Sequence, residues 1–219
     1  MMIESEPESI GTLTKEGELE RVYRLLKNWL VEGELAPGQV LSEMDLARRC
    51  ASSRTPVREA CSRLSQDGWL SRVRHKGYIV TPVSIADLLQ LYEYRKILEC
   101  FSARKAAELA LPEQLDALEE VIAPEVTPGA DIAQVVRASD TFHLGIAQIA
   151  GNQRVLHQLR LTLEYQHRLD CLSTRRDPYW IPHGEIIAAL RSRRGAEASE
   201  AMAAHIEHAR DRMLKLFGR

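Results

Sequence analysis

Two arginines and a threonine stand at the start of a predicted helix within residues 52–69, SSRTPVREACSRLSQDGW. Thr55 is a good N-cap residue and Pro56 suits the first helical position, so we expect the helix to begin at Pro56. Arg54, Thr55 and Arg58 then project from its N-terminal end. Guanidinium groups make bidentate contacts with guanine or phosphate, and the N-terminal end of a recognition helix enters the DNA major groove. The alternative is a surface helix whose arginines are solvated.

The rest of this predicted helix has one apolar face. Four residues recur on it at helical spacing, namely Val57, Ala60, Cys61 and Leu64. Arg63 falls on the other face and Gly68 ends the run. One side of the helix is therefore expected to be buried, while the other side stays exposed for binding.

The segments before this helix supply two further helices. Apolar residues from 15 to 33 form a helical stripe, and a Pro-Gly turn follows at residues 35–38. Ser42 is placed to cap a short second helix at 43–50, and residues 51–53 make a tight connection into the recognition helix. Residues 1–14, with three glutamates, are expected to be a disordered tail.

After Gly68 the pattern changes from helical to extended, as WLSRV and YIVTP flank a basic tip. This predicts a β-hairpin whose tip carries His75, Lys76 and Gly77. Helix, helix, recognition helix and hairpin is the order of a winged helix-turn-helix, in which the wing tip contacts the DNA backbone or minor groove. The neighbouring elements thus favour DNA binding over a solvated surface helix.

Residues 23–82 resemble the DNA-binding domain of the GntR superfamily of bacterial transcription regulators, with SRTPVREA, DGWL and KGYIV in the expected order. The resemblance implies DNA contacts at the positions Met44, Arg54, Thr55, Arg58 and Gly77. Met44 departs from the family pattern, because a thioether cannot replace the charge-assisted contacts of the arginine expected there. Arg48 or Arg49 could supply a phosphate contact instead.

Composition bounds the remainder of the chain. The 219 residues, 45% of them hydrophobic, suffice for two ordinary domains, and no apolar run approaches the ~20 residues of a membrane span. No signal peptide is predicted, and the four cysteines lack paired or metal-type spacing, which favours free thiols in a reducing cytoplasm. Residues 15–81 carry 12 Lys and Arg against 9 Asp and Glu, a weakly basic balance.

Residues 83–219 are predicted to be entirely helical, after a DNA-binding domain at 15–82. The periodic segments and their Pro and Gly breaks give six helices, at 86–110, 112–123, 132–150, 154–172, 178–193 and 196–217. Six helices without strands form an antiparallel bundle. The expected fold class is therefore mainly α, a winged helix-turn-helix with a small β-hairpin followed by an all-α bundle.

This second half resembles the helical domain of the FadR-type branch of the same superfamily, known as the FCD domain, in the fragments YRKILE, DTFHLGIAQIAGN, HGEIIAAL and AMAAH. The resemblance implies dimerisation, a small carboxylate effector and, in many members, a divalent metal held by one Asp and three His. The corresponding histidines are His143, His183 and His205. Three imidazoles suit Zn²⁺, Ni²⁺ or a similar ion.

The carboxylate of this metal set departs from the family pattern. The expected position, four residues before His143, is Ser139, and Asp140 follows it. At 100° per residue Asp140 lies about 60° from His143, so it shares the face and could ligate from another direction. His183 and His205 lie 12 and 10 residues from Gly195, which places them at similar heights if that glycine is the turn of a helical hairpin.

Arg95 and Glu99 stand one turn apart on the first helix of the bundle. Their simplest interpretation is an ordinary i,i+4 ion pair. The family resemblance instead places Arg95 at the effector pocket, where a guanidinium would meet an effector carboxylate.

The leading hypothesis is a cytoplasmic, ligand-responsive repressor that binds a near-palindromic operator in double-stranded DNA as a homodimer. A metal-dependent hydrolase fused to a DNA-binding head is the alternative, because a histidine site with an open position can activate water. No general base or nucleophile accompanies those histidines, so we expect no enzyme. A third possibility is a DNA-binding protein whose helical domain only dimerises and holds no ligand.

Overall fold

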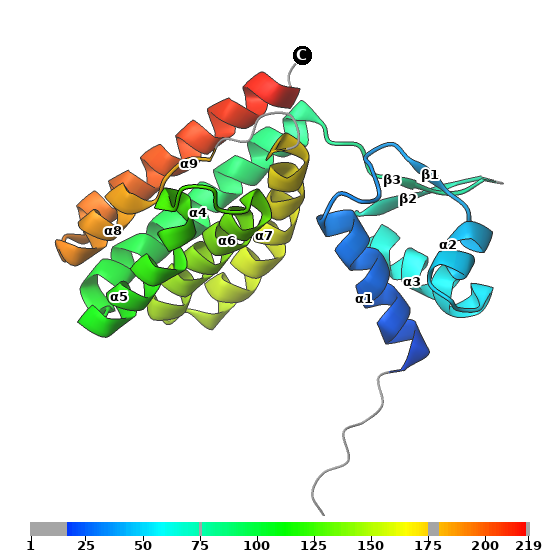
Figure 1. Cartoon of the computed structure of the whole chain (residues 1–219), viewed down its shortest axis with the longest axis horizontal. Coiled ribbons are helices and arrows are strands. Elements are labelled where there is room, and N and C mark those ends of the chain that lie inside the picture. The colour runs from blue at the N-terminus through cyan, green and yellow to red at the C-terminus, as the bar shows by residue number, and fades with distance from the viewer. Residues whose placement is uncertain (1–16, 75, 175–179, 218–219) are drawn as a thin grey trace, which may run out of the picture. The chain divides into compact units, whose positions relative to one another are not determined.

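The computed structural model describes residues 17–74, 76–174 and 180–217, so the expected N-terminal tail at 1–14 lies outside the described residues. Within these residues the chain forms two compact units (Figure 1). The first comprises the residues up to Asn28 together with Val40–Ile79, and the second comprises Trp29–Gln39 and the residues from Val80 onward. The mainly helical fold class is confirmed.

The first unit is a winged helix-turn-helix. The elements of this motif, in chain order, are α1 (Glu18–Val31), β1 (Val40–Leu41), α2 (Glu43–Arg49), α3 (Arg54–Gln66), β2 (Leu70–Val73) and β3 (Gly77–Val80). The last three residues of α1 and the last residue of β3 fall in the second unit. The four apolar residues predicted for the inner face of α3 are fully buried. Leu26 of α1 and Trp69, which follows α3, are buried as well. The face of α3 that carries the arginines is therefore left outside the core.

The helix starts agree with the predictions in α2 and differ in α3. Ser42 is the N-cap of α2, and its hydroxyl accepts a hydrogen bond of 3.0 Å from the backbone N–H of Asp45. Helix α3 begins at Arg54, two residues earlier than predicted, and Ser53 is its N-cap. Pro56 lies in the first turn, where backbone N–H groups have no intrahelical partner, so its missing donor does not prevent this earlier start.

The wing is a three-stranded sheet, whereas the sequence predicted only a hairpin. The strand order is β1-β3-β2, and β1 pairs antiparallel with β3 through Val40 with Ile79 and Leu41 with Tyr78. Strand β1 has two residues, too few to give a recognisable alternation. Gly77 has a φ of 97°, and a Cβ atom there would clash with the carbonyl oxygen of Leu41. This glycine is required by backbone conformation and by the close approach of β1.

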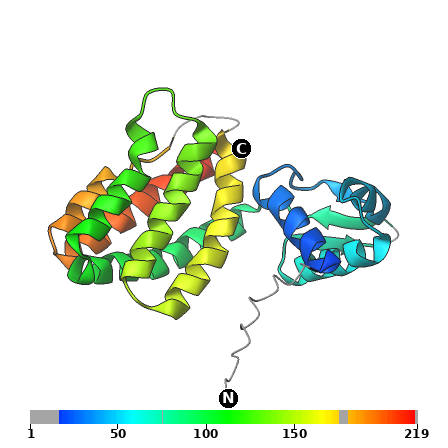
Figure 2. The ribbon, with the colours of Figure 1, turned by 60° about the horizontal axis from the view of Figure 1, so that its bottom comes forward.

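The second unit is a helical bundle. Its described elements are α4 (Ile85–Leu109), α5 (Pro112–Val121), a 3₁₀ turn η1 (Ala123–Val126), α6 (Ile132–Ile149), α7 (Gln153–Thr174), α8 (Gly184–Arg191) and α9 (Gly195–Phe217). Helix α4 packs along α9, and α6 lies beside both α4 and α7 (Figure 2). The core contains Tyr92 of α4, Phe142 and Ile146 of α6, and Leu190 of α8. Side chains from α4, α6 and α8 therefore meet in this core.

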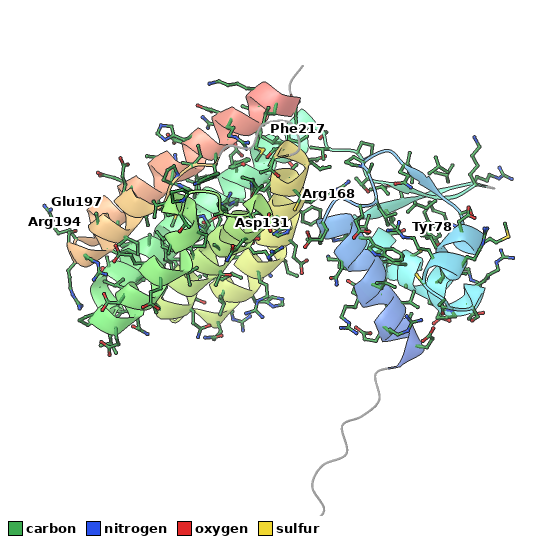
Figure 3. All side chains as sticks on the ribbon, viewed as in Figure 1. Tyr78, Asp131, Arg168, Arg194, Glu197 and Phe217 are labelled. Carbon is green, nitrogen blue, oxygen red and sulfur yellow. The ribbon has the colours of Figure 1, made fainter. Side chains whose placement is uncertain are left out.

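The connection between α8 and α9 differs from the predicted turn at Gly195. Arg193 takes the left-handed conformation with a φ of 58°, whereas Gly195 is the first residue of α9. A Cβ atom on Gly195 would lie 3.0 Å from the backbone oxygen of Arg104, so this glycine permits close approach of α9 to α4. Arg194 and Glu197 flank the start of α9 and form an ion pair of 2.5 Å (Figure 3).

Helix α8 is shorter than the predicted segment 178–193. Residues 175–179 lie outside the described residues, and residues 180–183 are not helical. The backbone N–H of His183 donates to Oε2 of Glu125 at 3.1 Å instead of to a carbonyl four residues earlier. His183 consequently occupies the N-cap position of α8.

None of the described helices combines the length and the apolar character needed to cross a bilayer.

Candidate DNA-contact surface and metal centre

The N-terminal end of α3 presents the residues predicted to read DNA. Arg54, Thr55 and Arg58 are all exposed. Arg54 Nη2 lies 3.5 Å from Oε2 of Glu43, a weak contact for a side chain that is largely in solvent. Within the described residues, no carboxylate lies at ion-pair distance from Arg58. These side chains can therefore reach a ligand without first breaking a buried interaction.

The predicted contacts on α2 are likewise at the surface. Met44 is 61% exposed, so its side chain is accessible at the surface of α2. Arg48 and Arg49 are exposed, and Arg48 pairs with Asp45 at 2.6 Å. All three residues belong to one short helix that directly precedes α3.

The wing carries the remaining predicted contacts. Lys76 is exposed and Gly77 is partly buried. His75 lies outside the described residues, so its position is not assigned. Gly77 is explained by the strand geometry above, and a backbone contact with DNA is not needed to account for it.

Three histidines from separate elements meet inside the helical unit. His143 comes from α6, His183 precedes α8 and His205 comes from α9, and all three are buried. One ring nitrogen from each lies within 4.8 Å of the others. Nε2 of His143 is 3.1 Å from Nε2 of His183, and the ring centres of His183 and His205 are 4.3 Å apart. The tertiary structure thus gathers imidazoles that are far apart in the sequence.

The outer ring nitrogens of two of these histidines face buried carboxylates. Oε2 of Glu99 lies 2.5 Å from Nδ1 of His143. Glu125, from the turn η1, bonds Nδ1 of His183 through one oxygen and its backbone N–H through the other. Carboxylates in these positions fix the orientation and tautomer of a histidine ligand, a common arrangement around metal sites. The sequence interpretation missed the role of Glu99 and missed Glu125 altogether.

Ser139, and not Asp140, lies next to the histidine cluster. Oγ of Ser139 is 3.4 Å from Nε2 of His183. The carboxylate of Asp140 turns instead to Nδ1 of His167 on α7. Among the described residues, no carboxylate oxygen joins the three imidazole nitrogens within 4.8 Å. The structure therefore does not bring Asp140 into the set in which the sequence placed it.

A cavity of about 60 Å³ adjoins the cluster, and its lining combines charged and polar side chains with apolar ones. Arg95 lines it, and its guanidinium bonds Glu99 through Nε at 2.6 Å and through Nη2 at 3.4 Å. Asp170, Gln166 and Arg212 line the same space. Arg95 is thus one partner of a buried ion pair and also part of the cavity wall. The ion pair predicted from the i,i+4 spacing is present, and the residue also lines a cavity in which an effector could bind.

Burial and neighbouring charges shift the pKa values of His183, His205 and Glu99. Burial lowers the pKa of His183 and, together with the neighbouring rings, lowers that of His205 further. Burial alone would raise the pKa of Glu99, but Arg95 and the ring of His143 outweigh it and bring the value to about 2. His183 and His205 are therefore neutral near pH 7, the form that binds metals, beside an ionised carboxylate.

The geometry fits a divalent metal. With metal–nitrogen bonds of about 2.0–2.1 Å, two ligands of a tetrahedral or octahedral ion stand about 2.8–3.4 Å apart. The distance of 3.1 Å between the two Nε2 atoms falls in this range. Glu99 and Glu125 on the outer nitrogens assign the protons to Nδ1, which leaves two Nε2 lone pairs facing one another. A metal ion is a natural group to satisfy both.

A winged helix that exposes arginines at the start of its recognition helix, in one chain with a helical unit that holds a cavity beside buried histidines, defines a DNA-binding transcription regulator. The family models agree with this class. The model described as bacterial regulatory proteins, gntR family, matches residues 18–80, and that of the FCD domain matches residues 90–208. The chain belongs to the GntR family of bacterial regulatory proteins and carries an FCD domain.

Known relatives extend over most of the chain. The Nta operon transcriptional regulator of Aminobacter aminovorans is 27% identical over 184 residues, which cover 82% of this chain and 87% of that protein. The HTH-type transcriptional repressor RspR of Escherichia coli K12 is 28% identical over 195 residues, 86% of this chain and 85% of RspR. These relatives and the two families describe a DNA-binding regulator and not an enzyme, which argues against the hydrolase alternative.

Solved structures share the fold of the chain. The structure of E. coli McbR/YncC has a TM-score of 0.74 at 21% identity and covers 93% of this chain and 100% of its own. A GntR-type regulator from Rhodococcus sp. RHA1, described as putative, has a TM-score of 0.70 at 24% identity, with 91% and 98% coverage. At this identity the likeness concerns the fold alone.

Proposed function

We propose that the chain is a ligand-responsive repressor that binds a near-palindromic operator as a homodimer. In this proposal a small carboxylate effector and a divalent metal, held by His143, His183 and His205, occupy the helical unit. The observation that carries it is the convergence of three buried imidazoles, two of them oriented by carboxylates, beside a cavity in a DNA-binding regulator. Because such a regulator works at the chromosome, we expect it to act in the bacterial cytoplasm.

The proposed DNA contacts follow from exposure and charge at the start of α3. Arg54 and Arg58 would reach base edges or phosphates, with Thr55 between them, because bidentate guanidinium contacts with guanine carry most direct readout of this kind. Arg48, Arg49 and Lys76 would bind phosphates and fix the orientation of the helix in the groove. The name of the relative RspR supports repression as the mode of action.

The proposed effector site is the cavity beside the histidines. Two of the five N–H groups of Arg95 are directed to Glu99, so its remaining donors are left for an anionic ligand. A metal on the three histidines would add positive charge to the same space and would polarise a bound carboxylate. Both features favour a small anion over a neutral ligand.

The proposed dimer uses an apolar surface of α4 and α7. Tyr94, Ile97 and Phe101 are exposed at helical spacing on α4, and exposed Leu161 comes from the adjacent α7. Ile97 is 69% exposed, and contiguous apolar patches of this kind mark contact surfaces. A second copy of the chain is the occupant that a near-palindromic operator requires.

Two measurements test this proposal. Plasma mass spectrometry of untagged protein, purified without chelator, should find about one metal per chain. Selection of bound duplexes from a random DNA library should recover a near-palindromic site that Arg58→Ala no longer enriches. No metal, even after reloading with Zn²⁺, Ni²⁺ and Mn²⁺, together with normal operator selection would reduce the helical unit to a dimerisation domain.

A further inference from the structure

The side chains that face the proposed metal site carry no negative charge. The imidazoles of His143, His183 and His205 converge, and the hydroxyl of Ser139 lies 3.4 Å from Nε2 of His183. A serine hydroxyl is a weak ligand for a borderline divalent ion unless it loses its proton. A metal bound here would therefore keep its full double charge in its first coordination sphere.

The carboxylates around the cluster are committed elsewhere. Glu99 and Glu125 bind the outer nitrogens of His143 and His183, so they orient the ligands without touching the metal side of the rings. Asp140 is held by His167. Asp170 lines the cavity, but both its oxygens lie 3.1 Å from Nε2 of Gln166. Within the described residues, the protein thus places no carboxylate oxygen beside the three imidazole nitrogens, so it offers no anionic ligand to a metal bound there.

A metal on the three imidazoles would itself attract an anion into this cavity. Arg95 lines the cavity with its charge balanced by Glu99, and Arg212 lines it with Nη1 3.0 Å from Oγ of Ser173. Adding two positive charges to this buried space is unfavourable unless an anion accompanies them, because charges interact strongly where water is excluded. The cavity of about 60 Å³ admits only a small one.

We infer that this site binds its metal and a small chelating carboxylate cooperatively, each raising the affinity for the other. The inference rests on the proposed metal site and specifies its regulation: Ser139 leaves open the place where an anionic side chain would otherwise complete the site, and the effector carboxylate fills it. Reciprocity of binding free energies requires that the metal raise anion affinity by the same factor. A rise in effector concentration would then increase the fraction of protein that holds both metal and carboxylate, at the expense of the metal-free protein and the protein with metal alone.

The experiment titrates metal into chelator-stripped full-length protein, against a chromophoric chelator, with and without malonate. Malonate is a small dicarboxylate, and malonamide is its uncharged counterpart. Free Zn²⁺ and Ni²⁺ concentrations are corrected for malonate complexes. We expect malonate to lower the apparent Kd for the metal by about tenfold or more, within the usual range of coupling between sites, and malonamide to leave it unchanged.

Two variants at one position give the matched comparison. Ser139→Asp supplies a carboxylate from α6 and should bind metal tightly without malonate, with most of the coupling lost. Ser139→Ala removes only the hydroxyl and should keep the coupling of the wild type. If Ser139→Asp fails to fold by circular dichroism, the contrast between malonate and malonamide on the wild type still decides the matter.

The outcomes separate this inference from the proposed function. Tight metal binding by the wild type that malonate does not change would overturn the cooperativity and leave the metal site standing. Absence of binding in both the wild type and Ser139→Asp, with malonate present, would remove the metal site itself and the inference with it.

Discussion

Glu125 and His183 are 58 positions apart in the chain, yet both carboxylate oxygens of Glu125 bind that one histidine, at its ring Nδ1 and at its backbone N–H. The second contact stops α8 from extending toward its N-terminus, and the first holds the ring with Nε2 toward His143. One buried carboxylate thus decides both where a helix begins and where a ligand points.

Replacing this carboxylate should weaken the metal site. Glu125→Gln keeps the shape of the side chain but removes the charge that orients His183, and outer-shell partners of this kind are worth about 10–100-fold in metal affinity. Chelator competition measures the change. Glu120→Gln, an exposed residue of α5, is the matched control and should bind metal like the wild type. Equal affinity in all three proteins would mean that Glu125 serves only the helix start.

Removing His183 itself should abolish metal retention. In His183→Ala the cluster keeps only two imidazoles, too few for stable binding, while the winged helix-turn-helix is unaltered and operator affinity stays largely intact. The measurements are metal content by plasma mass spectrometry and an operator binding isotherm. His157→Ala, an exposed histidine of α7, controls for the loss of an imidazole. Full metal occupancy in His183→Ala would exclude this residue from the site.

Arg58→Ala should weaken operator binding by about 1–3 kcal/mol and relax base preference. The reason is the loss of a bidentate donor at the start of α3, where the side chain is exposed. Fluorescence anisotropy at fixed salt measures the effect on selected and scrambled duplexes. Arg154→Ala removes the same charge from an exposed position in the helical unit and should change little. An unchanged isotherm for Arg58→Ala would contradict the recognition-helix assignment.

The Asp140 and His167 pair should make stability depend on pH. Burial disfavours the charged ring, but the hydrogen bond with Asp140 raises the pKa of His167 to about 11, above its ordinary value of 6.5. The folded state therefore holds this proton more tightly than the unfolded state, so the contribution is complete below about pH 6.5 and is lost as pH rises toward 11.

Asp140→Asn removes that contribution. In metal-free protein, urea unfolding should show the wild type more stable than the variant by about 1 kcal/mol at pH 6, with allowance for solvent screening, and by less at pH 9. His157→Gln, at an exposed histidine, should track the wild type at both values. A gap between wild type and Asp140→Asn that widens with pH would show that His167 is neutral in the folded state.

A charge on the apolar surface of α4 should separate the proposed dimer. Ile97→Glu would bury an unpaired carboxylate between two copies and weaken association by several kcal/mol. Analytical ultracentrifugation should then report a monomer, with a loss of operator affinity. Val126→Glu, at an apolar residue that is 81% exposed away from this surface, is the control and should leave the dimer intact. A dimeric Ile97→Glu would move the interface elsewhere.

The local features of the winged helix could be predicted because they depend on neighbours in the sequence. The buried face of α3 follows from the spacing of Val57, Ala60 and Leu64, and the cap at Ser42 follows from a side chain three residues from its partner. Strand β1 could not be predicted, since its two residues become a strand only by pairing with β3. The start of α3 differed because Pro56 is tolerated throughout a first turn.

The candidate metal centre likewise has residues that the sequence could predict and residues that it could not. The family resemblance pointed to His143, His183 and His205, and helical periodicity placed Asp140 near the face of His143. Whether that carboxylate turned to the metal or away depended on His167, a residue of another helix. The partners Glu99 and Glu125 meet their histidines across 44 and 58 intervening steps of chain, distances over which no local pattern operates.

The sequence by itself determined most of the helices, because amphipathic periodicity, caps and turn residues act over a few positions, and its family resemblance indicated the kind of protein. It fixed a winged helix-turn-helix with arginines at the start of the reading helix, followed by a bundle that carries three histidines. The tertiary structure decided that Ser139 and not Asp140 faces those histidines, and which carboxylates orient them. Side-chain partners in a buried site are chosen by packing between helices, and only the folded chain specifies that packing.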